Sequence, residues 1–371
     1  MSREMTKQKK EPLFQMVKRD YIAPSKALLI RFAAVALALV VCALVIIAIT
    51  KQNPVEVYGG IISGAVGTKR RAWVTVRETV LLLLIAVGLT PAFKMKFWNI
   101  GAEGQILIGG TCSAAIMIYL GDKLPNALLL VMIFIVSILA GMVWSLLPAV
   151  FKAKYNTNET LFTLMLNYVA MQIVTFCIVF WENPSGSNTV GVINSKSKGG
   201  WFPSIGGSQY VLNVIIVLVV TILISVYMNY SKQGYELAVV GESQNTARYA
   251  GINVKKVIIR TVLLSGAICG LAGAVVVSGG SHTISTSTAG GRGFTAIIVA
   301  WMAKFNPIAM VVISLLLVFM QQGAIQIASQ FSLNENASDI ITGILLFFLI
   351  GCEFFIHYQI KLHKKSKEVQ S

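Results

Sequence analysis

The chain has 371 residues, of which 56% are hydrophobic and only 12% are charged, whereas an average soluble domain has about 25% charged residues. With a mean hydropathy of +0.73, the sequence has too little polar surface to cover a water-soluble particle, which excludes soluble, collagen-like and disordered classes. The net charge of +16 does not indicate a nucleic-acid partner, because the basic residues lie in the short breaks between apolar runs, where membrane proteins use them for orientation.

The N-terminal segment is basic and leads into the first apolar run. Residues 1–31 contain eight Lys and Arg, and the following run, 32–49, has no charged residue. Its 18 residues are about enough to span the hydrocarbon of a bilayer. We therefore predict a cytoplasmic tail, 1–31, and a retained first helix rather than a cleaved signal peptide.

Nine further apolar runs follow along the chain. They lie at 80–93, 100–120, 127–151, 161–181, 210–230, 257–279, 294–303, 307–331 and 340–357. The pattern predicts an all-α polytopic membrane protein with about ten transmembrane segments, a membrane domain over 32–357 and a cytoplasmic C-terminal tail, 358–371. With both termini inside, 22 of the 31 basic residues fall on the cytoplasmic face, as the positive-inside rule requires. Residues 51–79, with five basic residues on the outer face, fit the rule badly.

Two of these runs are too short for ordinary spanning helices. The run 80–93 precedes a stretch of Gly, Asn and Glu residues, and the run 294–303 lies between a Gly-rich segment and Asn306-Pro307. Short, Gly- or Pro-interrupted segments in two related halves are typical of broken or half-spanning helices around a midplane substrate site. Ordinary loops with helix caps are the alternative.

The sequence gives no support for an enzyme or a metal site. It contains neither an HExxH pattern nor a phosphate-binding GxxxxGK[ST] loop, and its five cysteines form no CxxC pair. His282 lies in a Ser/Thr-rich outer loop, where a solvated histidine is expected. We predict no catalytic residue, no metal ligand and no cofactor in this chain.

Polar residues inside apolar runs are the candidates for a substrate path. Glu103 is an acid among glycines, so it must face a polar partner, a water-filled cavity or a loop. It either accepts hydrogen bonds from a substrate or binds the N-terminal amides of the helix that follows it. Asn99 and Gln105 fit either role.

Three more residues complete the predicted path. Asn167 lies in the middle of an apolar span, where an amide needs a partner; helix–helix hydrogen bonding is the alternative. Phe294 and Trp301 are seven residues apart, so they share one face of a helix, although packing explains such a pair equally well.

The segment 231–256 is the longest polar stretch assigned to the inner face. Ser243 can cap a short helix that runs to about Ala250 and is ended by Gly251. Such a helix is a docking surface for a cytoplasmic partner, or an amphipathic helix on the lipid surface. The candidate coupling residues are Gly241, Glu242, Ala247, Arg248, Gly251 and Asn253.

Four motifs carry a resemblance to a known family. GESQNTARYAGINV at 241–254 and SGAICGLAGA at 265–274 resemble the signature of bacterial ABC importer permeases of the sugar, nucleoside and branched-chain amino acid superfamily. NIGAEGQ at 99–105 resembles the nucleoside branch in particular, and GFTAIIVA at 293–300 is similar to the second-half motif of the superfamily.

The resemblance implies a division of labour between several chains. This chain is then the permease subunit of a nucleoside importer, multi-pass in the cytoplasmic membrane of a bacterium. A separate ATPase binds ATP and Mg, a second permease chain completes a heterodimeric core, and an extracytoplasmic lipoprotein captures the substrate. The alternatives are a simple-sugar permease and, from another class, an ion-coupled secondary transporter, which ordinarily needs more intramembrane ionisable groups than Glu103 alone.

Overall fold

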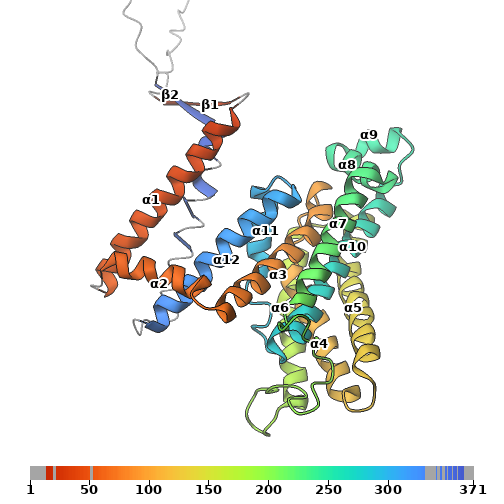
Figure 1. Ribbon diagram of the computed structural model, residues 1–371. Coiled ribbons are helices and arrows are strands. Elements are labelled where there is room, and N and C mark those ends of the chain that lie inside the picture. Colours follow the sequence, from red (N-terminus) through yellow and green to blue (C-terminus); the bar gives the residue numbers. More distant parts are fainter. Residues whose placement is uncertain are drawn as a thin grey trace, which may run out of the picture. The chain divides into compact units, whose positions relative to one another are not determined.

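Long runs of Leu, Ile, Val and Ala, broken by Gly, Pro and Asn, fold into helices that satisfy their own backbone groups, as a bilayer requires. The computed structural model describes residues 14–19, 22–50, 53–330 and, with gaps, 340–362. Helices dominate it (Figure 1). The described residues belong to two units, Met1–Gly64 with Gly323–Ser371 and Ala65–Gln322, and each unit is described by itself.

The unit Ala65–Gln322 holds most of the helices. Their bounds are α3 (Lys69–Lys94), α4 (Ala102–Leu120), α5 (Asn126–Tyr155), α6 (Glu159–Trp181), α7 (Val211–Tyr230), α8 (Lys232–Glu242), α9 (Gln244–Tyr249), α10 (Val254–Val276), the π-helical turn η1 (Val277–Ser281), α11 (Arg292–Met302) and most of α12 (Pro307–Gln330). In the described part of the chain, eight helices are long and apolar enough to cross a membrane, and two shorter apolar helices accompany them. The predicted all-α polytopic class is confirmed.

The prediction that the run 80–93 is a short segment of its own is wrong. Helix α3 begins at Lys69 and has 26 residues, so the run 80–93 is only its second half. Thr68 caps it by accepting a hydrogen bond from the Arg71 amide at 3.2 Å. Lys, Arg and Glu are good helix formers, so the charged stretch before residue 80 extends the helix instead of forming a loop. The second prediction is confirmed, because α11 has only 11 residues.

Helix α10 lies at the centre of this unit and packs against α3, α4 and α5. The motif at 265–274 supplies the small residues that these contacts need. A Cβ atom at Gly270 would overlap the Ser137 carbonyl oxygen of α5, and one at Gly273 would overlap the Ile106 carbonyl oxygen of α4. In membranes, where van der Waals packing drives helix association, such close approach stabilises the bundle.

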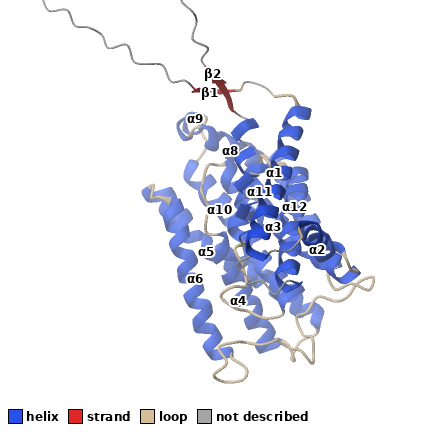
Figure 2. Cartoon of the chain, turned by 90° about the vertical axis from the view of Figure 1, so that its left-hand side faces the viewer, coloured by secondary structure: helices blue, strands red, loops and turns tan. Residues whose placement is uncertain are grey.

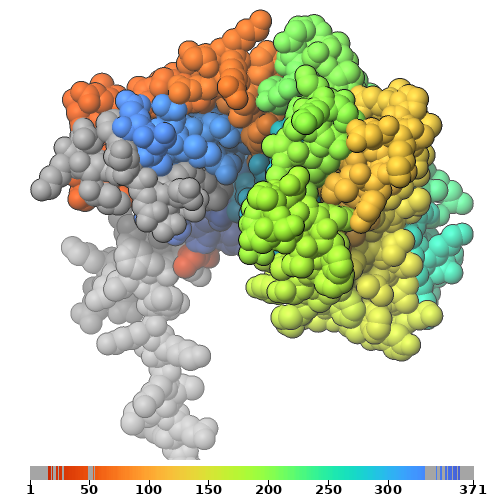
Figure 3. All heavy atoms as spheres, turned by 90° about the horizontal axis from the view of Figure 1, so that it is seen from below, coloured from red at the N-terminus to blue at the C-terminus, as the bar shows by residue number. Residues whose placement is uncertain are grey.

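The two ends of the bundle carry different structures. Helices α8 and α9 lie at one end, and the long loop 182–209 between α6 and α7 lies at the other (Figure 2). Figure 3 looks onto the loop end, where the lime and green atoms of α6, this loop and the start of α7 cover part of the unit. The predicted coupling segment, 231–256, and the loop 182–209 are therefore at opposite ends.

The other unit contains α1 (Pro24–Thr50), most of α2 (Pro54–Val66) and a two-stranded sheet. Strands β1 (Phe14–Lys18) and β2 (Tyr358–Leu362) pair antiparallel, with Phe14 opposite Leu362. The predicted tails, 1–31 and 358–371, thus supply one strand each, and α1 starts before the predicted boundary at residue 32. Tyr58 Oη donates to the Leu39 carbonyl and joins α2 to α1. Of the 18 residues of the predicted segment 340–357, seven lie outside the described residues.

Candidate functional site

The predicted site residues Asn99 and Gln105 bind each other at the break between α3 and α4. Asn99 is completely buried. Its Nδ2 donates to Ser265 Oγ of α10 at 3.2 Å, and its Oδ1 accepts from the Gly101 amide at 3.1 Å and from Gln105 Nε2 at 3.3 Å. Both side chains are therefore fully engaged in holding the irregular backbone against α10.

Asn167 of α6 performs the same task from the other side of the break. Its Nδ2 donates to the Ile100 carbonyl oxygen at 3.0 Å, and its Oδ1 accepts from the Gly104 amide at 2.9 Å. These backbone groups precede or begin α4 and have no helical partner of their own. One amide side chain thus supplies the acceptor and the donor that the start of α4 needs.

Glu103 joins α4 to the half-length helix α11. Its Oε1 accepts from the Gly291 amide at 2.6 Å and its Oε2 from the Gly293 amide at 2.8 Å. The expectation that Glu103 binds amides of the helix that follows it is wrong: the amides belong to the start of α11. Gly291 has a φ of 71°, a conformation that glycine adopts without strain, and a Cβ at Gly293 would lie 2.6 Å from Glu103 Oε2.

A second buried acid, Glu78 of α3, was not recognised in the sequence. Glu78 is 7% exposed and binds two guanidinium groups. Arg292 donates to Glu78 Oε2 from Nε at 3.0 Å and from Nη2 at 2.8 Å, and Arg77 donates to Oε1 from Nε at 3.0 Å and from Nη2 at 2.5 Å. The pair Arg77-Glu78 at the start of an apolar run was the available signal, but it lay in a stretch interpreted as an outer loop.

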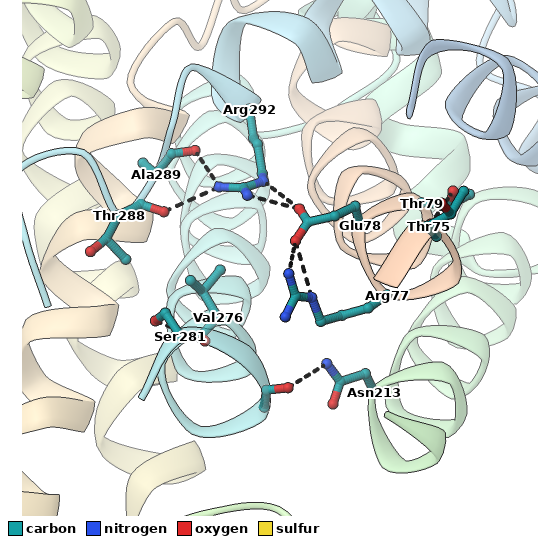
Figure 4. Close-up of polar contacts among 11 residues, drawn as sticks. Thr75, Arg77, Glu78, Thr79, Asn213, Val276, Ser281, Thr288, Ala289 and Arg292 are labelled. Carbon is teal, nitrogen blue, oxygen red and sulfur yellow. Dashed lines mark hydrogen bonds and ion pairs between the residues drawn. The ribbon is translucent and has the colours of Figure 1, made fainter. Parts of the chain in front are cut away.

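These groups border a polar cavity of about 230 Å³ inside the unit Ala65–Gln322. Figure 4 shows Arg77 and Glu78 on α3, Asn213 on α7 and Arg292 at the start of α11 around it. Hydroxyl groups of the segment 281–288 and the apolar side chains of Leu81, Val275 and Val276 complete the lining. None of the six predicted path residues lines this cavity.

Phe294 and Trp301 differ from the four polar residues of the predicted path. They are 43% and 41% exposed on α11. Trp301 stacks on Trp98, with ring centroids 5.2 Å apart and planes 15° apart. The structure therefore presents these rings at the surface of the unit, whereas Asn99, Glu103, Gln105 and Asn167 are enclosed.

The predicted coupling segment forms two short helices. Ser243 caps α9 by accepting from the Thr246 amide at 3.2 Å, α9 ends at Tyr249, and Gly251 has a φ of 76°, so the predicted cap and stop are confirmed. Ala247 is buried, whereas Glu242 and Arg248 are exposed. Gly241 packs against the Lys94 carbonyl at the end of α3. Asn253 caps α10 by accepting from the Lys256 amide at 3.1 Å, which gives it a structural task.

His282 is not the solvated loop residue that was expected. Its ring stacks on Trp201, with centroids 3.7 Å apart and planes 5° apart, and its Nδ1 is buried without a hydrogen-bond partner among the described residues. Burial and, second, the nearby Arg77 charge lower the pKa of His282 to about 4. Among the residues that the structure describes, no three His, Cys, Asp or Glu side chains lie close enough to hold a metal ion.

Comparisons with known proteins identify the family. Residues 74–350 match the family described as "Branched-chain amino acid transport system / permease component". The guanosine ABC transporter permease protein NupP of Bacillus subtilis is 28% identical over 91% of this chain and 97% of its own length. The nucleoside ABC transporter permease protein NupB of Lactococcus lactis is 25% identical over 85% and 88%.

A relative with a different substrate in its name is similar to the same degree. The glucose ABC transporter permease protein TsgB13 of Haloferax volcanii is 26% identical over 83% of each chain. No solved structure matches the chain. Because the family match covers well over half of the sequence, the chain belongs to this family of membrane transport permeases and is a transport component rather than an enzyme.

Proposed function

We propose that the chain is the permease subunit of an ABC importer that carries nucleosides. The similarity to NupP and NupB, which extends over nearly the whole of both relatives, carries this proposal, and the motif at 99–105 supports it. A simple sugar is the second candidate, because TsgB13 is named for glucose and is about equally similar.

The ion-coupled alternative finds little support in the buried acids. Such a transporter ordinarily needs intramembrane carboxylates that can exchange protons or ions. Glu78 is held by two guanidinium groups, and Glu103 is held by two backbone amides. Both carboxylates therefore have their charge compensated by fixed donors.

The segment α8–α9 is the proposed docking surface for a cytoplasmic ATPase, which would bind ATP and Mg. Tyr235 and Tyr249 are 67% and 94% exposed there, and tyrosine is enriched at protein–protein interfaces. The Arg260 guanidinium pairs with Glu236 at 3.3 Å and ties α8 to α10. A displacement of α8 would therefore be transmitted to α10, the central helix of the bundle.

The remaining parts of the assembly follow from the same proposal. Both termini lie in the bacterial cytoplasm, a second permease chain pairs with this one, and a lipoprotein delivers substrate to the outer face. Phe294 and Trp301, which are exposed on α11, offer aromatic faces to a base along the path. The geometry of Asn99, Glu103, Gln105 and Asn167 favours holding the helices over lining the path.

Reconstitution tests the proposed function. The permease is assembled with its ATPase and second permease in liposomes, and uptake of labelled adenosine, guanosine and glucose is measured with the lipoprotein outside. We expect ATP-dependent nucleoside uptake that survives collapse of the proton gradient. Uptake by this chain alone under a pH or sodium gradient would overturn the importer assignment, and uptake of glucose but no nucleoside would select the sugar permease.

A further inference from the structure

An open groove of about 670 Å³ runs along the first half of α10 in the unit Ala65–Gln322. Its apolar wall consists of half-exposed side chains, among them Ile259 and Leu263 of α10 and Met142 of α5. Helices α5 and α10 pack against each other (Figures 1 and 2), and the groove lies beside this contact. An apolar face of the bundle is therefore left uncovered by the described part of the chain.

The uncompensated charge of the groove lies at one end. Lys255 and Lys256 line the groove where α10 begins, and the lining side chains further along α10 are apolar except for Arg260. The charge of Arg260 is compensated, because its Nη2 pairs with Glu236 of α8 at 3.3 Å. Neither lysine forms an ion pair with another described residue. Two free positive charges thus mark the start of the groove.

These two lysines lie where a helix disfavours positive charge. They belong to the first turn of α10, which contains no acidic residue. The N-terminus of a helix carries a partial positive charge, which stabilises anions and destabilises cations. By contrast, Lys152 lies in the last turn of α5, where a cation is favoured, and it pairs with Glu159 at 2.8 Å. An anion at the start of α10 would be stabilised both by the lysines and by the helix.

The length of the groove matches one leaflet of a bilayer. Lys256 and Ala267, the last lining residue along α10, are 11 residues apart, which corresponds to about 16 Å along a helix. The hydrocarbon core of a bilayer is about 30 Å thick, so one leaflet contributes about 15 Å. A molecule with its anion at the lysines would therefore extend its apolar part to about the midplane.

From this arrangement we infer that the groove binds an anionic phospholipid, with its phosphate at Lys255 and Lys256 and an acyl chain along the apolar wall. Basic pockets at the cytoplasmic ends of transmembrane helices suit anionic headgroups, and the proposed orientation puts this end of the bundle on the cytoplasmic side. A free phosphate would leave the apolar wall uncovered. A zwitterionic lipid would bring its own cation to the two lysines.

A second apolar groove, on α6, offers an internal comparison. It has a volume of about 330 Å³ and is lined by apolar side chains, among them Leu161 and Met165, with Asn158 as its polar group. Of the described residues, no Lys or Arg lines it. Acyl chains can cover such a surface, but no charge there distinguishes one headgroup from another. Headgroup selectivity is therefore expected only at the groove on α10.

Native mass spectrometry tests the site. The protein is purified with the chains that assemble with it, and the binding of dioleoyl phosphatidylglycerol and dioleoyl phosphatidylcholine is titrated. We expect phosphatidylglycerol to bind about tenfold more tightly, because two basic residues near an anionic headgroup contribute about that factor. The double variant Lys255→Gln/Lys256→Gln should lose the preference. Lys196→Gln/Lys198→Gln is the matched control, since it removes the same charge from two exposed lysines of the loop 182–209 and should keep the preference.

Filling the groove separates a bound lipid from attraction to surface charge. Ala267→Trp leaves both lysines in place and obstructs the far part of the groove, so we expect it to weaken the binding of phosphatidylglycerol several-fold. Leu166→Trp, in the groove on α6, should leave that binding unchanged. Glycerol phosphate, which has the anion without an acyl chain, should not compete. The exposed lysine pair decides the matter if Ala267→Trp fails to assemble.

The opposite outcomes are equally definite. Equal binding of the two lipids, or an unchanged preference in Lys255→Gln/Lys256→Gln, overturns the inference and leaves the start of α10 to a protein partner. A preference that Ala267→Trp leaves intact, or that glycerol phosphate abolishes, shows attraction to the lysines alone and overturns the lipid groove. None of these results bears on the proposed function, because lipid binding is measured without transport and without substrate.

Discussion

The break between α3 and α4 and the cavity beside Glu78 are both polar regions in an apolar bundle, but they treat their polar atoms differently. At the break, the amides of Asn99, Gln105 and Asn167 all have partners, and Glu103 takes two backbone N–H groups. At the cavity, Arg77 Nη1 makes no hydrogen bond to another described residue. Satisfied polar groups in a membrane hold a structure together, whereas unsatisfied ones require water or a ligand.

The carboxylates of Glu103 and Glu78 differ in what they bind. Glu103 accepts hydrogen bonds from amides at the start of a helix and forms no ion pair with another described residue, which makes it part of the backbone scaffold. Glu78 is bound by two side chains of opposite charge, one from its own helix and one from α11. The half-length helix α11 is therefore fixed at its start by both regions, through Gly291 and Gly293 on one side and Arg292 on the other.

The largest effect is expected for Glu78→Ala. The change leaves two guanidinium groups without their carboxylate in a buried place, and breaking a buried ion pair costs about 3–5 kcal/mol. We expect loss of assembly, measured as recovery of a monodisperse complex and as thermal unfolding. Glu56→Ala, at an exposed acid, is the control and should change stability by less than about 0.5 kcal/mol. Normal stability of Glu78→Ala would contradict the role given to this carboxylate.

A smaller loss of stability should follow from Glu103→Gln and Asn167→Ala. Each removes one or two hydrogen bonds to backbone groups that have no other partner, at a cost of about 1–3 kcal/mol per bond. We expect a lower unfolding temperature with an unchanged KM in the complexes that survive. Intact stability with lost uptake would instead make these residues part of the substrate path.

Local signals made part of the molecule predictable. The cap at Ser243 and the stop at Gly251 are set by side-chain and φ preferences over a few residues, so the pattern found α9 nearly to its ends. The glycines at 265–274 allow the close helix contacts that recur along α10. The short segment before residue 303 has glycines on one side and a proline on the other.

Long-range pairing made the rest unpredictable. Arg292 and Glu78 are 214 residues apart in the sequence, and no local pattern indicates that the two charges meet. Hydropathy alone also placed the start of the segment 80–93 too late, because the charged residues before residue 80 look like a loop when their partners are unknown. The amides that Glu103 binds were assigned to the wrong helix for the same reason: only the tertiary fold brings Gly291 to it.

The coupling segment at the end of the bundle offers a third case, in which a change at the exposed Gly251 turn disturbs no buried atom. Gly251→Val forces a β-branched residue into a φ of 76°. A Cβ atom at this position would meet no atom beyond its two chain neighbours within 4 Å, so the cost is backbone strain of about 1–2 kcal/mol. We expect weaker ATPase stimulation and uptake with unchanged membrane levels. Gly251→Asn is the matched control, because Asn tolerates this conformation better than Val. Equal activity of the two variants would remove the coupling role from the turn.

The smallest effect is expected at His282, a third kind of polar group, half-buried beside the cavity with an unpartnered Nδ1. Its pKa is lowered from 6.5 to about 4, first by burial and second by the Arg77 charge. Between these two pH values the unfolded chain therefore binds a proton that the folded chain does not bind. The stability that the neutral ring contributes is fully present above pH 6.5 and is lost as the pH falls toward 4.

The variant His282→Phe keeps a ring for stacking on Trp201 but cannot titrate. The unfolding temperature of the native chain should fall more steeply than that of His282→Phe between these two pH values, with the two curves parallel above pH 7. Parallel curves throughout the acid range would show that His282 gains its proton as readily in the folded chain as in the unfolded one, and that the stacked ring is open to water.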